Sequence, residues 1–101
     1  MSGSHVIRAD GGAITVPGAV LETVARRAAE TVADARVRRR GLEVEIEGGR
    51  ARVTLELTVR YGAVLPDVAR AVQERVAGEL ERMCGLEPAS IDVLVEELVS
   101  P

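Results

Sequence analysis

Cysteine and histidine, which serve most often in nucleophilic catalysis and zinc binding, are scarce in this sequence and do not combine into a site. The 101 residues include one cysteine, Cys84, and one histidine, His5. A nucleophilic site needs a base next to its nucleophile, and a structural zinc site needs four ligands, usually Cys or His. A lone cysteine on an apolar helix is typical of packing. We therefore predict no catalytic residue, no metal site, no cofactor and no enzymatic activity.

The one dense run of charge is basic. Arg36, Arg38, Arg39 and Arg40 precede Gly41, and such a run could contact phosphates. Against this, acidic residues follow at once from Glu43, the net charge is −3, and aromatic residues make up 1% of the chain. Nucleic-acid surfaces combine a basic patch with aromatic stacking. We expect no nucleic-acid partner, and we take the four arginines as a candidate interaction surface on a loop or sheet edge. The alternative is a solvated cluster, or a charged edge that prevents pairing between sheets.

The elements around this run predict a β-hairpin with a defined register. If Gly48-Gly49 forms a two-residue turn, Glu47 lies opposite Arg50 and Glu45 opposite Arg52. The same register pairs apolar residues on the other face: Ile46 with Ala51, Val44 with Val53, and Leu42 with Leu55. Charge and apolar matching thus agree. Continued pairing would place Arg40 among apolar residues opposite Leu57, so we predict that the ladder stops or bulges near Gly41.

Two amphipathic helices flank the hairpin. The first begins near Pro17 and has an apolar stripe at helical spacing: Val20, Leu21, Val24, Ala25, Ala28 and Val32. The second follows Tyr61-Gly62 and has the stripe Val68, Ala69, Val72, Val76, Leu80 and Met83. Gly85 fits a left-handed helix cap, with Leu86 folding back on the last turn. Gly78 lies inside this helix at a cost of ~1 kcal/mol relative to alanine, which indicates either close approach of another backbone or mere tolerance of the glycine.

The C-terminal segment predicts one more strand. Ile91, Val93 and Val95 alternate with Asp92, Leu94 and Glu96, which places the apolar Leu94 on the polar face. Leu98 follows near the end of the chain. We take Leu94 and Leu98 as a candidate self-association surface, with an ordinary exposed leucine as the alternative.

Together these elements predict an α+β fold. Its element order is β-α-β-β-α-β, with a small mixed sheet and both helices packed on one face. Residues 1–11 are expected to be a flexible N-terminal tail or a cloning remnant, and residues 12–101 a single domain. No apolar run approaches the ~20 residues that span a bilayer, so we expect no direct membrane insertion.

Several short motifs occur in an order that carries a family resemblance. They are Ile14-Thr15-Val16 leading into Val20 to Ala29, the hairpin at Gly48-Gly49, Val59-Arg60-Tyr61-Gly62, Gln73 with Val76, and Met83-Cys84-Gly85-Leu86 before Ile91-Asp92-Val93. Over about residues 12–99 this pattern resembles the alkaline shock protein family of bacterial envelope stress proteins. Cys84 departs from the family pattern, which more often has threonine there.

The resemblance implies a non-enzymatic protein of the bacterial envelope stress response. It implies a cytoplasmic location at the inner face of the membrane, through a membrane-anchored protein partner, and self-assembly into a homo-oligomer. The alternative is a nucleic-acid-binding domain resembling the KH class, suggested by Arg36 to Arg40 and the element order. The sequence lacks the GXXG loop that such a domain needs.

Overall fold

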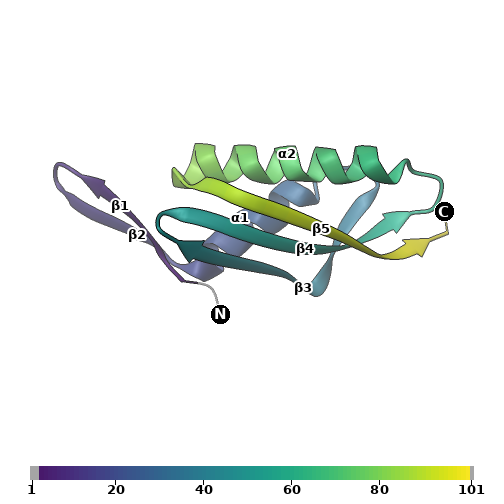
Figure 1. The fold of residues 1–101 in the computed structure, drawn as a ribbon, viewed down its shortest axis with the longest axis horizontal. Helices are drawn as coiled ribbons and strands as arrows, with labels where there is room; N and C mark the ends of the chain where they lie inside the picture. Colours follow the sequence, from purple (N-terminus) through teal and green to yellow (C-terminus); the bar gives the residue numbers. More distant parts are fainter. Residues whose placement is uncertain (1–2, 101) are drawn as a thin grey trace.

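The computed structural model describes residues 3–100. Its elements are β1 (His5–Ala9), β2 (Gly12–Val16), α1 (Gly18–Ala29), β3 (Ala35–Glu47), β4 (Arg50–Arg60), α2 (Leu65–Cys84) and β5 (Glu87–Val99). β4 is the middle strand of a mixed sheet, antiparallel to β3 and parallel to β5. Both helices cover one face of this sheet (Figure 1). The predicted α+β class is confirmed.

The first element differs from the prediction. β1 pairs with β2 in a separate two-stranded sheet, so the element order is β-β-α-β-β-α-β. This hairpin extends away from the body at one end of a molecule 51 Å long (Figure 1). β1 falls in residues 1–11, for which a flexible tail was expected, and residues 1–2 lie outside the described part. The alternation of His5 to Ala9 is too short to predict a strand by itself.

The central hairpin has the predicted register. Glu47 lies opposite Arg50, Glu45 opposite Arg52, and Leu42 opposite Leu55. Gly48 and Gly49 both have positive φ, 58° and 77°, as a two-residue hairpin turn requires. The predicted interruption near Gly41 is also confirmed, because the pairing jumps from Val37–Leu57 to Leu42–Leu55. The segment 38–41 thus bulges opposite the single residue Glu56.

The core lies between the helices and the covered face of the sheet. Val53, Leu55 and Leu57 of β4 are fully buried, as the strict alternation of that strand predicts. In each helix one predicted stripe residue points outward instead: the exposed fraction is 46% for Val20 and 58% for Met83. On α2 the stripe ends at the buried Cys84, because the last turn presents that position to the sheet.

The end of α2 forms the predicted glycine cap. Gly85 has φ 61°, and its N–H donates to the Glu81 carbonyl. The N–H of Leu86 donates to the Leu80 carbonyl at 3.1 Å, and Leu86 is fully buried. Gln73 joins the middle of the same helix to the sheet, since its Nε2 donates to the Ile91 carbonyl at 2.9 Å. α2 is therefore fixed to β5 at its centre as well as at its end.

β5 contains a register shift that alternation could not predict. Val95 pairs with Leu57, but the next β4 residue, Thr58, pairs with Glu97, so Glu96 is an extra residue. One extra residue moves every later side chain to the opposite face. Leu94, opposite Glu56, is on the open face, whereas Leu98, opposite Val59, is on the helix side. Both are about half exposed, but they do not form one surface.

Candidate functional surfaces

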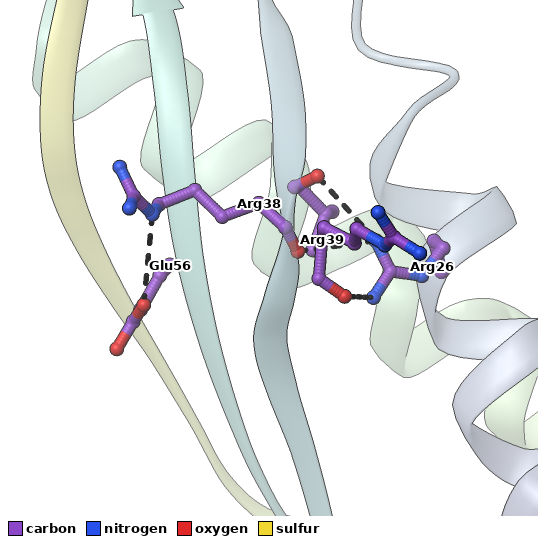
Figure 2. Close-up of polar contacts among 5 residues, drawn as sticks. Arg26, Arg38, Arg39 and Glu56 are labelled. Atoms are coloured by element: carbon purple, nitrogen blue, oxygen red, sulfur yellow. Dashed lines mark hydrogen bonds and ion pairs between the residues drawn. The ribbon is translucent and has the colours of Figure 1, made fainter.

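The arginine cluster lies on an edge strand and not in a loop. Arg36 to Arg40 belong to β3, the outer neighbour of β4, and Arg38 to Arg40 form its bulge. The Arg38 side chain points away from α1 and across β4, where its Nε lies 3.8 Å from Glu56 Oε1 (Figure 2). Both side chains are substantially exposed, so this pair contributes little stability. The structure does not place Leu94 or Leu98 in this cluster, because they lie on β5.

α1 covers the backbone of the bulge with a side chain that the sequence did not single out. Arg26 Nη1 donates to the Val37 and Arg38 carbonyls at 3.4 and 3.2 Å, and Nη2 donates to the Arg39 carbonyl at 3.1 Å (Figure 2). Glu30, one helical turn further on, accepts the Val37 N–H at 3.2 Å. Arg26 and Glu30 thus give Val37 the donor and acceptor that a neighbouring strand would otherwise supply.

An apolar groove runs between the two helices on the surface away from the sheet. Its volume is about 810 Å³, and its lining residues are Ala19, Val20, Thr23, Val24, Arg27, Ala28, Thr31, Glu74, Arg75, Gly78, Glu79 and Met83. The exposed side chains of Val20 and Met83 belong to it. The expectation that Gly78 marks a close backbone contact is wrong: a Cβ at this position would meet nothing within 4 Å. Gly78 instead leaves the groove wide at its middle.

Charged side chains border the groove. Arg75 Nη1 donates to Thr31 Oγ1 at 2.7 Å and so connects α2 to the turn that follows α1. On the α2 side, Arg82 forms a two-point contact with Glu79, with both N–O distances 2.8 Å. These hydrogen bonds lower the pKa of the Glu79 carboxyl. Glu79 therefore stays ionised and does not have the raised pKa of a general acid.

Replacing Gly78 tests whether the groove is open. Alanine at this position would meet no neighbour and would raise helix propensity, so Gly78→Ala should increase the free energy of unfolding by about 1 kcal/mol. Urea denaturation followed by circular dichroism measures the change. A decrease would mean that an unseen group fills the groove beside Gly78.

The single cysteine and the single histidine are both buried. Burial raises the pKa of the Cys84 thiol, which keeps it protonated and poorly nucleophilic. His5 lies in β1 with 8% of its surface exposed. Within residues 3–100 no group of three His, Cys, Asp or Glu side chains could hold a metal ion. None of the helices described there is long and apolar enough to cross a membrane.

These features define a small two-layer α+β domain whose arginine cluster lies on a sheet edge and whose apolar groove lies between its two helices. The model of a family that is described as having a cell envelope-related function matches residues 12–100. The chain belongs to this family, the alkaline shock protein family, which is not a known enzyme family. No curated protein and no solved structure matches the chain significantly.

Proposed function

We propose that this protein is a non-enzymatic scaffold or interaction module at the inner face of the bacterial membrane, held there by a membrane-anchored partner. The observation that carries the proposal is the family match over residues 12–100, with its cell envelope-related function. The surface features support it, because the described chain offers a bordered apolar groove and a sheet with one open face. Such surfaces suit binding to other proteins.

The alternative nucleic-acid-binding function finds no support in the geometry. Arg38 pairs with Glu56, and Glu43 and Glu45 continue on the same strand as the arginines. Acidic side chains beside a basic cluster reduce the positive potential that phosphates need. Self-association into a homo-oligomer stays a prediction that accompanies the scaffold proposal.

Cell fractionation tests the proposal directly. In the native bacterium the tagged full-length chain should sediment with membranes and be released by an alkaline carbonate wash, as a peripheral protein is. Pull-down should recover a membrane-spanning protein, and deleting the gene of that protein should move the chain to the supernatant. A chain that stays in the supernatant of native cells, with no membrane-spanning protein recovered, would contradict the proposal.

A further inference from the structure

The two outer edges of the three-stranded sheet differ in how their backbone groups are satisfied. On β3, Arg26 and Glu30 occupy the outward N–H and C=O of Val37, and Arg26 also occupies the carbonyls of Arg38 and Arg39. A further strand therefore cannot pair with this part of β3 without displacing α1 side chains. The β3 edge is closed at its bulge.

The outer edge of β5 is closed by a side chain only at Ile91, whose carbonyl accepts the Gln73 Nε2–H at 2.9 Å. At the other end of the strand the Val99 carbonyl faces β4, because it accepts the N–H of Tyr61, the residue after Arg60. From Asp92 to Leu98 no strand or side chain within residues 3–100 binds the outward backbone groups. An edge strand with free N–H and C=O groups is a template for pairing with another extended chain.

The side chains of β5 restrict what can pair there. The strand carries Glu87, Asp92, Glu96 and Glu97 and has no basic residue. Two copies paired through β5 would bring these acids together, and like charges across strands are destabilising. Pairing β5 with the bulged part of β3 from a second copy would require displacing Arg26 and Glu30. Pairing of β5 with β5, or with the β3 bulge, of another copy is thus disfavoured. A strand with basic side chains would instead complement the acidic residues of β5.

We infer that the β5 edge from Asp92 to Leu98 binds an extended, basic segment of another protein by strand addition. In such binding, backbone hydrogen bonds supply affinity and alternate side chains supply specificity. Arg or Lys of the partner would face Asp92 and Glu97 on the open face, with an apolar side chain against Leu94, which is 51% exposed. The inference rests on the proposed scaffold function and specifies how its partner is held.

Two modified peptides test strand addition with the full-length protein. The probe is a nine-residue peptide that alternates arginine with valine or leucine, in two forms, N-methylated on the arginines or on the apolar residues. In a strand, alternate N–H groups point to opposite sides. One form should therefore bind like the parent peptide, and the other about tenfold more weakly, the loss expected for two or more backbone hydrogen bonds. Fluorescence anisotropy measures both.

Charge-reversed variants locate the binding site. Asp92→Lys with Glu97→Lys should weaken binding of the parent peptide about tenfold, whereas Glu43→Lys with Glu45→Lys, the same charge change on the β3 strand, should leave it unchanged. Equal binding of the two methylated peptides would mean charge attraction alone and would overturn the inference. The inference would also be overturned if sedimentation showed a dimer that is dissociated only by the charge-reversed β5 variant. Neither result alters membrane fractionation, so failure here is distinguishable from failure of the proposed function.

Discussion

Gly41→Ala is expected to lower the free energy of unfolding by about 1–3 kcal/mol, the range for inserting a methyl group into a filled site. Gly41 is buried at the end of the β3 bulge, and a Cβ there would lie 2.7 Å from Glu56 Cβ and 3.1 Å from the Glu56 carbonyl oxygen. The second contact is with backbone, so no side-chain rotation relieves it. The β3 and β4 strands would have to separate at the bulge.

Urea denaturation of the purified chain measures the Gly41 effect. Gly49→Ala is the comparison variant, because a Cβ at Gly49 would meet nothing within 4 Å and its cost arises from φ 77° alone. Gly41→Ala should also increase hydrogen exchange in β3 and leave α2 unchanged. A Gly41→Ala protein as stable as the parent would show that the bulge is not packed against Glu56 as described.

The hairpin was predictable because two independent patterns in it agree. Glu45 opposite Arg52 and Val44 opposite Val53 require the same register, and a shift by one residue would break both. The bulge was predictable for a related reason, since regular pairing would have placed Arg40 on the covered face. In both cases the information is local, within one hairpin.

Features that depend on contacts between distant segments could not be predicted. The extra residue Glu96 is defined by the pairing of β5 with Leu57 and Thr58, and alternation within β5 gives no sign of it. The existence of the groove depends on the distance between the two helices, and the apolar stripes of the helices do not specify that distance. The Arg26 contact joins a helix to a strand. Its only signal in the sequence is that Arg26 and Glu30 lie one helical turn apart and so on the same side of the helix. β1 was missed because its five residues alternate weakly.

Arg26→Ala should both destabilise the fold and open the β3 edge. The guanidinium donates to three successive carbonyls, and losing hydrogen bonds from a charged donor should reduce the free energy of unfolding by roughly 1–2 kcal/mol. Arg26→Lys should recover only part of this, because a point ammonium cannot reproduce the planar fork. The freed Val37 to Arg39 backbone should then favour pairing between chains.

Two measurements separate these effects. Urea denaturation should show the loss for Arg26→Ala and a change within about 0.5 kcal/mol for the adjacent, exposed Arg27→Ala, as for ordinary surface positions. Sedimentation velocity over a concentration series should show more association for Arg26→Ala than for Arg27→Ala. If Arg26→Ala matches Arg27→Ala in both experiments, the β3 edge is not closed by α1. The contrast between the β3 and β5 edges, on which strand addition at β5 depends, would then disappear.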